Sequence, residues 1–176
     1  MLAHRRGILG ILCLFLPCFS LLSGFPVASE GRPLTRILIP RGASAHLQHA
    51  SSELQDFLQR MTDAVIPVEM GEAGGEGAIC LGFSSQGLGL DEYVVESEGG
   101  RVRLDGGGER GPLYAVYGLL KALGCLWPLP EELWLEIPHC RDLEIPSLTL
   151  RASPYFPIRG VHCELCRRVT LTQNFN

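Results

Sequence analysis

Residues 92–124 read EYVVESEGGRVRLDGGGERGPLYAVYGLLKALG, and this stretch contains the elements that decide the fold. Residues 92–97 (EYVVES) and 101–105 (RVRLD) flank a Glu-Gly-Gly turn, and this spacing predicts a β-hairpin. Pro112 is tolerated in the first turn of a helix, and Gly124 is typical of a helix end. We therefore expect two antiparallel strands followed at once by a helix with an apolar inner face.

Upstream of this stretch, the pattern predicts one strand-helix pair and two more strands. Residues 35–40 form a short apolar run closed by proline, and Ser44 can cap a helix that continues to Met61 with apolar residues at helical spacing. Residues 66–70 resemble an edge strand, and residues 78–82 resemble a central one. The expected fold class is α+β, a two-layer sandwich with a mostly antiparallel or mixed sheet and two helices on one face.

Length and composition limit the possible functions. The chain has 176 residues, of which 46% are hydrophobic and 19% charged, so it is expected to form a packed core rather than a disordered segment. Its net charge of −4 leaves no basic surface for nucleic acid. A (β/α)₈ barrel needs at least about 200 residues, so this chain cannot contain a whole one.

The amino terminus has the pattern of an export signal. Arg5 and Arg6 precede an apolar run over residues 7–22, and small residues follow it. Cleavage is expected after Ser29 or, as a close alternative, after Ala28. An uncleaved membrane anchor is the other interpretation, but the run is interrupted by a proline and is shorter than the roughly 20 residues of a spanning helix. The predicted protein is therefore secreted or periplasmic, with no stable membrane span after cleavage.

A glycine motif follows the predicted hairpin. Gly106, Gly108 and Gly111 match the G-x-G-x-x-G pattern of dinucleotide-binding loops, and an acid stands about 20 residues further on, at Glu131. However, the strand before the motif, residues 101–104, alternates charged and apolar side chains, whereas the first strand of a dinucleotide fold is apolar throughout. We interpret the glycines as a tight turn and expect no nucleotide cofactor.

The second helix and its surroundings resemble a known domain. The stretch GGGERGPLYAVYGLLKALGCLWPLPEE, residues 106–132, is similar to the end of the small N-terminal domain of exported α-glucuronidases and of the second domain of β-N-acetylhexosaminidases. Residues 37–68 resemble the start of the same domain. The resemblance implies a non-catalytic domain that packs beside a catalytic (β/α)₈ barrel. The matching residues are Arg110, Gly111, Tyr114, Tyr117, Leu120, Gly124, Cys125 and Trp127.

The end of the chain extends this resemblance. Residues 154–160, PYFPIRG, are similar to the start of the first barrel strand in hexosaminidases, where the arginine binds sugar hydroxyls. The resemblance therefore implies substrate binding by Arg159. The family continues with an aspartate and an arginine, and this chain has Glu164 and Arg167 there. Beyond Arg167 the match fades, so the family's catalytic acids have no counterpart.

These features divide the chain into a signal at 1–29, an α+β domain at 30–146 and the beginning of a barrel at 147–176. The expected function is a non-catalytic accessory domain of a glycoside hydrolase, whose carbohydrate contact depends on a barrel that is missing or separate. No catalytic residue, metal or other cofactor is assigned. Hydrolysis of a glycoside needs two positioned carboxyl groups or one with help from the substrate, so the chain is expected to be inactive.

Two alternatives belong to other classes of protein. The first is a free-standing carbohydrate-binding module that uses aromatic side chains as a platform, although aromatic residues in such patterns more often belong to the core. The second is a small redox or metal protein that uses Cys163 and Cys166 next to His162, with His139 and Cys140 as further metal ligands. The candidate platform consists of Tyr114, Tyr117, Trp127 and Trp134.

Arg110 has an unusual position for a cation. It stands at the first turn of the predicted second helix, where the helix dipole disfavours positive charge. We therefore expect Arg110 to pair with an acid, with Asp105 and Glu109 as the candidates.

Overall fold

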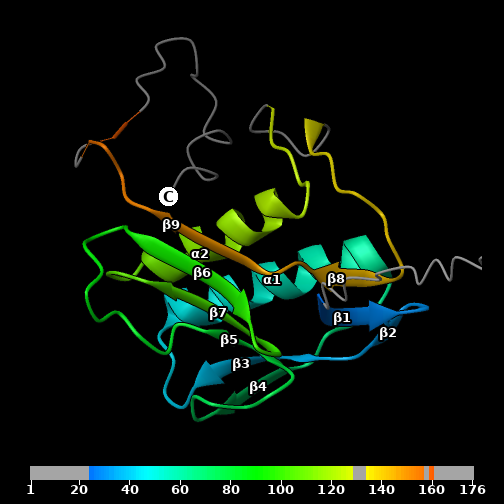
Figure 1. Cartoon of the computed structure of the whole chain (residues 1–176). Coiled ribbons are helices and arrows are strands. Elements are labelled where there is room, and N and C mark those ends of the chain that lie inside the picture. Colours follow the sequence, from blue (N-terminus) through cyan, green and yellow to red (C-terminus); the bar gives the residue numbers. More distant parts are fainter. Residues whose placement is uncertain (1–23, 129–133, 157–158, 161–176) are drawn as a thin grey trace, which may run out of the picture.

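The computed structural model describes residues 24–128, 134–156 and 159–160. Two sheets and two helices make up this part of the chain (Figure 1). The elements are β1 (Phe25–Ser29), β2 (Arg32–Pro33), β3 (Arg36–Pro40), α1 (Ala45–Thr62), β4 (Val68–Gly71), β5 (Ala78–Leu81), β6 (Tyr93–Glu98), β7 (Arg101–Gly106), α2 (Gly111–Ala122), β8 (Leu143–Ile145) and β9 (Leu148–Ala152).

The main sheet has six strands in the order β4-β3-β5-β7-β6-β9. The pairs β3–β4, β3–β5 and β5–β7 are parallel, whereas β6 pairs antiparallel with β7 and with β9. Both helices lie on the same side of this sheet (Figure 1). The fold is thus an α+β sandwich with a mixed sheet, which confirms the predicted fold class.

Helix α1 follows from strong local signals. The side chain of Ser44 accepts a hydrogen bond from the amide of Leu47, as expected of an N-cap residue. The buried residues recur at helical spacing and contact the sheet, and Asp63 ends the helix in the left-handed conformation, with a φ of 64°. The buried side chains include Leu47, Ala50, Leu54, Phe57, Leu58 and Met61.

The hairpin and helix α2 match the prediction closely. Gly99 and Gly100 connect β6 to β7 with φ of 61° and 72°, the left-handed pair that a two-residue hairpin turn requires. Pro112 lies in the first turn of α2, and Gly124 follows its end with a φ of 98°. The buried residues of α2 lie against the sheet and against α1.

A second, three-stranded sheet was not foreseen from the sequence. It has the order β2-β1-β8, and both of its pairings are antiparallel. Phe25 and Val27 of β1 and Ile145 of β8 are buried in the same core as the two helices. The sequence expectation had assigned residues 25–29 to the export signal and had predicted no strand at residues 143–145.

The main sheet also extends beyond its expected end. Strand β9 begins at Leu148 and covers the free edge of β6, with Leu148 and Leu150 facing the core. The expected domain of residues 30–146 therefore leaves one strand of each sheet outside.

The described helices include none that is long and apolar enough to cross a bilayer.

Candidate functional site

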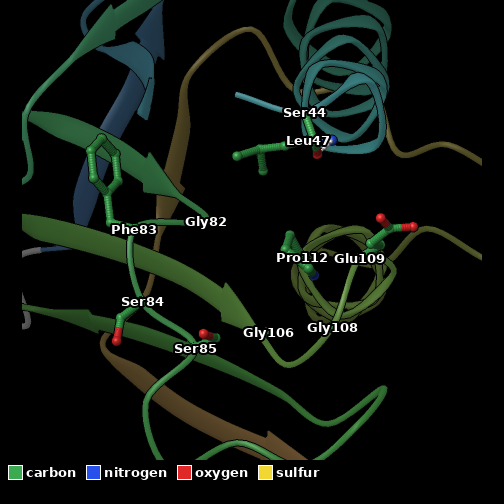
Figure 2. Close-up of a pocket in the computed structure, with 10 residues that line it drawn as sticks. All are labelled: Ser44, Leu47, Gly82, Phe83, Ser84, Ser85, Gly106, Gly108, Glu109 and Pro112. Atoms are coloured by element: carbon green, nitrogen blue, oxygen red, sulfur yellow. Dashed lines mark hydrogen bonds between the residues drawn. The ribbon is translucent and has the colours of Figure 1, made fainter. Parts of the chain in front are cut away.

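The loops at one edge of the main sheet form a pocket at the start of both helices. Strands β3, β5 and β7 run parallel, so the loops that follow them meet at the same edge. The pocket has a volume of about 350 Å³ (Figure 2). Its lining residues are Ser44, Leu47, Gly82, Phe83, Ser84, Ser85, Gly106, Gly108, Glu109 and Pro112.

The polar side chains of the pocket are serine hydroxyls and one carboxylate. Ser84 and Ser85 come from the loop after β5, while Glu109 comes from the loop before α2 (Figure 2). Glu109 is the one carboxylate among the ten lining residues, and it is largely exposed, 3.6 Å from Nδ1 of His46. Glycoside hydrolysis needs a second positioned carboxyl group or a reactive group of the substrate, and the lining of this pocket contains one carboxylate.

The glycine motif is used to pack the chain against itself. A Cβ atom on Gly106 would overlap the backbone of Gly111, and one on Gly107 would overlap the carbonyl oxygen of Gly89. The amide of Gly107 donates to the carbonyl oxygen of Glu92 at 2.8 Å. In a dinucleotide-binding loop, the glycines leave room for the pyrophosphate, whereas here backbone of the same chain fills that space. The tight-turn interpretation is confirmed.

Beside this turn, two arginines meet on one buried carboxylate. Oδ2 of Asp91 accepts hydrogen bonds from Nη2 of Arg110 at 2.9 Å and from Nη2 of Arg159 at 2.5 Å. The Asp91 side chain is 4% exposed, and the amide of Asp91 donates to the carbonyl oxygen of Gly107. The Arg159 guanidinium also lies over the ring of Tyr114 on α2, 5.7 Å from its centre. We refer to Asp91, Arg110 and Arg159 as the arginine clamp.

The clamp confirms one prediction and corrects another. Arg110 is paired with an acid, as its position at the helix start required. The acid is Asp91, however, and neither Asp105 nor Glu109. Asp105 instead accepts hydrogen bonds from Arg103 and from the amide of Ser84. The bond to Asp105 raises the pKa of the Arg103 guanidinium.

A second ion pair holds β9 next to the clamp. Nε of Arg151 donates to Oε1 of Glu92 at 2.7 Å, and Nη2 of the same arginine donates to the carbonyl oxygen of Gly87. The amide of Gly89 donates to the other oxygen of Glu92, and these two contacts, first the amide and then the arginine, hold the pKa of Glu92 below its usual range. The loop of residues 82–92 is therefore attached to both β9 and the start of α2.

Beyond Ala152, residues 153–156 and 159–160 continue from β9 along this edge, and we call them the exit segment. Tyr155 is 90% exposed and Phe156 63% exposed, with the two rings 4.8 Å apart and nearly perpendicular. Leu90, on the loop next to Asp91, is also exposed. All three of these large apolar side chains are exposed, and each lies within four positions of a clamp residue in the sequence.

The aromatic residues of the predicted sugar platform do not lie in one plane. Tyr117 and Trp127 contact each other and Phe57 with inter-ring angles between 53° and 76°, so their faces point in different directions. The hydroxyl of Tyr117 donates to Oε2 of Glu53 on α1, and burial together with this bond raises its pKa. This cluster joins α1 to α2. Trp134 is exposed and makes none of these ring contacts.

The predicted metal or redox residues are tested only in part. Cys163, Cys166 and His162 lie outside the described residues. His139 contacts Asp63 at 3.2 Å, and the thiol of Cys140 donates to the carbonyl oxygen of Asp142. Among residues 24–128, 134–156 and 159–160 no cluster of three histidine, cysteine or acidic side chains could hold a metal ion. Cys80, Cys125 and Cys140 are free thiols.

Of the predicted site residues, the structure places Arg159 in the clamp, while Glu164 and Arg167 lie outside the described residues. The residue that sequence reasoning missed is Asp91. Nothing in the local sequence marks this loop aspartate, because its two partners come from positions 19 and 68 residues further along the chain.

Comparison with known proteins supports the fold. No model of a known protein family matches the chain, and no curated protein sequence matches it. The fold is similar to part of a family GH115 4-O-methyl-α-glucuronidase with specificity for decorated arabinogalactans, with a TM-score of 0.56 and 17% identity over 74% of this chain. It is also similar to part of the GH20 β-N-acetylhexosaminidase from Streptomyces coelicolor A3(2), with a TM-score of 0.53 and 18% identity over 76% of this chain. The chain spans 18% and 24% of the lengths of these two enzymes. Its fold is therefore one that occurs within glycoside hydrolases.

Proposed function

We propose that this chain is a non-catalytic accessory domain of a carbohydrate-active glycoside hydrolase, which packs beside a catalytic (β/α)₈ barrel that begins with the exit segment. The observation that carries the proposal is the exposed pair Tyr155 and Phe156 in the exit segment, the segment that also contains Arg159 of the clamp. Large apolar side chains grouped in this way are typical of a surface that is covered by another domain. Here the pair lies where the chain leaves the sheet.

The division of the chain follows from the same argument. We propose that the folded unit runs from Phe25 to Ala152 and that the barrel begins beyond it. Strand β1 is part of the core, so an export signal that is cleaved after Ser29 would remove buried residues from the domain. We therefore propose cleavage before Phe25. N-terminal sequencing of the exported protein tests this, and a mature chain that starts at Glu30 would contradict it.

Carbohydrate contact is proposed for Arg159, on the resemblance of residues 154–160 to the start of a barrel strand. Arg159 is 43% exposed, so part of its guanidinium remains accessible while Asp91 holds the rest. A single partly exposed arginine binds sugar hydroxyls weakly, and it cannot protonate a leaving group. The barrel would supply the remaining sugar contacts and the catalytic acids.

The decisive experiment is to read the transcript and the genomic region beyond the codon of Asn176. The expected result is an open reading frame that continues into the alternating strands and helices of a barrel. If the frame stops and no barrel is encoded nearby, the accessory-domain proposal fails. Binding of glycans by the chain alone would then favour the carbohydrate-binding module.

Enzyme assays make the same proposal measurable. The chain of 176 residues and a product extended by the barrel are compared for turnover of aryl N-acetyl-β-glucosaminides and aryl α-glucuronides. The extended product is expected to turn over one of these substrates, and the short chain none, because the lining of the pocket described above contains a single carboxylate. Turnover by the short chain that disappears in Glu164→Gln, but persists in Glu72→Gln on an exposed loop, would contradict the proposal.

A further inference from the structure

Asp91 combines two features that are unfavourable for folding. Its backbone is in the left-handed region, with a φ of 61°, and its buried Oδ1 has no hydrogen-bond partner among the described residues. The other described non-glycine residues with positive φ, Glu30 and Asp63, are both exposed, and Asp63 ends helix α1. Left-handed backbone and an unsatisfied buried oxygen each cost stability. Their coincidence at one residue indicates a role in holding a partner.

The partner is the guanidinium of Arg159. The carboxylate of Asp91 receives one N–H of this group, and the ring of Tyr114 supports one of its faces. An arginine has five N–H donors in a rigid plane, so one bond to Asp91 and one ring contact fix the direction of the donors that remain. Arg110 adds a second positive charge to the same carboxylate oxygen, and its own side chain is 59% exposed.

We propose that Asp91 is a positioning residue, which orients the guanidinium of Arg159 toward a sugar at the junction between this domain and the barrel. This rests on the proposed function. It means that the accessory domain contributes to the sugar site through one of its own loops. The alternative is that Arg159 depends only on the barrel for its orientation and that its contact with Asp91 is incidental.

Two variants separate these possibilities. Asp91→Asn keeps the size of the side chain and tolerates the left-handed backbone, but it removes the negative charge. Arg110→Gln is the matched control, because it removes the other arginine of the clamp and leaves the bond between Asp91 and Arg159 in place. Arg159→Gln breaks the same bond from the other side.

The primary measurement is the NMR order parameter of the Arg159 Nε–H group in the full chain, a property that overall stability does not set. This group is expected to be ordered in the wild-type chain and in Arg110→Gln, and mobile in Asp91→Asn. The second measurement is the rate of chymotrypsin cleavage between Tyr155 and Phe156. Loss of a hydrogen bond to a charged group is expected to raise this rate about tenfold in Asp91→Asn and Arg159→Gln.

Either of two results would overturn the proposal. One is an Arg159 Nε–H group that is as ordered in Asp91→Asn as in the wild type. The other is a cleavage rate that changes by less than about twofold in Asp91→Asn, or that rises equally in Arg110→Gln. These measurements do not depend on a barrel. Failure of the positioning role is therefore distinguishable from failure of the accessory-domain function, which is decided by the reading frame beyond Asn176.

Discussion

The two helices lie side by side on one face of the sheet, but they start in different ways. Helix α1 begins with Ser44, whose side chain caps the amide of Leu47 three residues away. Helix α2 begins with Arg110, which makes no capping bond within its own helix and instead reaches Asp91 in a distant loop. The first helix start is determined locally, whereas the second depends on contacts between segments far apart in the chain.

This difference accounts for the position of the arginine clamp at the start of α2. The N-cap side chain of α1 binds a free amide of the first helical turn, so this helix start depends less on contacts with distant segments. The start of α2 contacts the glycine turn and the loop of residues 82–92, and Arg110 pairs there with Asp91. Arg159 of the exit segment binds the same Asp91. The start of α2, which depends on contacts with distant segments, is therefore also the helix start connected to the exit segment.

The largest expected effect tests the glycine turn before α2. In Gly107→Ala, the new Cβ would overlap the carbonyl oxygen of Gly89, and neither backbone segment can move freely. We expect a loss of about 3 kcal/mol or more in the free energy of unfolding, measured by urea denaturation. Gly89→Ala is the control, since its Cβ would meet only the flexible end of Glu92, at 3.3 Å. Equal losses in both variants would show that the close approach at Gly107 is not what matters.

The next effect tests the local start of α1. Ser44→Ala removes the N-cap acceptor and is expected to cost about 1 kcal/mol in the free energy of unfolding. Ser52→Ala, in an exposed position of the same helix, is the control and is expected to be neutral or slightly stabilising. If the two variants are equally stable, α1 does not depend on its cap, and the contrast between the helices weakens.

A comparable effect concerns the contact between the two helices. Tyr117→Phe removes the hydrogen bond to Glu53 and is expected to cost about 1 kcal/mol near neutral pH. The raised pKa of Tyr117 adds a pH dependence. In the unfolded chain this hydroxyl ionises near pH 10, while in the folded chain it keeps its proton. The wild type should therefore lose stability as the pH rises above 10.

This alkaline loss provides the check on Tyr117. Thermal unfolding midpoints measured between pH 8 and pH 11 should fall more steeply for the wild type than for Tyr117→Phe. Tyr155→Phe is the control, because Tyr155 is 90% exposed and makes no hydrogen bond to the described residues. Identical slopes for the wild type and Tyr117→Phe would mean that burial of this hydroxyl does not persist in solution.

The smallest effect is expected at Arg110. Replacing it with glutamine removes one partner of Asp91, but it also removes a positive charge from the start of a helix, where the dipole opposes it. Since Arg110 is 59% exposed and Arg159 keeps its bond to Asp91, the two consequences should nearly cancel. We expect a change within about 0.5 kcal/mol by urea denaturation. A loss above that of Ser44→Ala would show that Arg110 acts as the cap of α2.

Local signals were sufficient to predict a large part of the sheet and both helices. Ser44, the apolar stripe of α1, the turn at Gly99 and Gly100 and the stop at Gly124 are each readable within a few residues, and each was found at its expected place. The mixed character of the sheet was anticipated as well. These features share one property, which is that the residues that cause them are neighbours in the sequence.

The features that were missed depend on distant partners or on ambiguous composition. The stretch Phe25–Ser29 has the small and apolar residues of a signal-peptide end, and the same residues suit a buried strand. Leu148 and Leu150 alternate with polar residues, a strand signal that was available but was attributed to the tail. The acid that pairs with Arg110 was sought among its neighbours, but a loop brings Asp91 to it from 19 positions earlier.

Strand β9 has a consequence for synthesis of the protein. The ribosome makes β6 and β7 long before β9, so the growing chain carries β6 as an open edge until residues 148–152 have emerged. An open edge offers unpaired N–H and C=O groups to any other extended chain, including another nascent copy. A product that stopped before Leu148 would keep this edge permanently and would tend to aggregate. Of the described strands in this sheet, β9 is made last, and it protects newly synthesised molecules from one another.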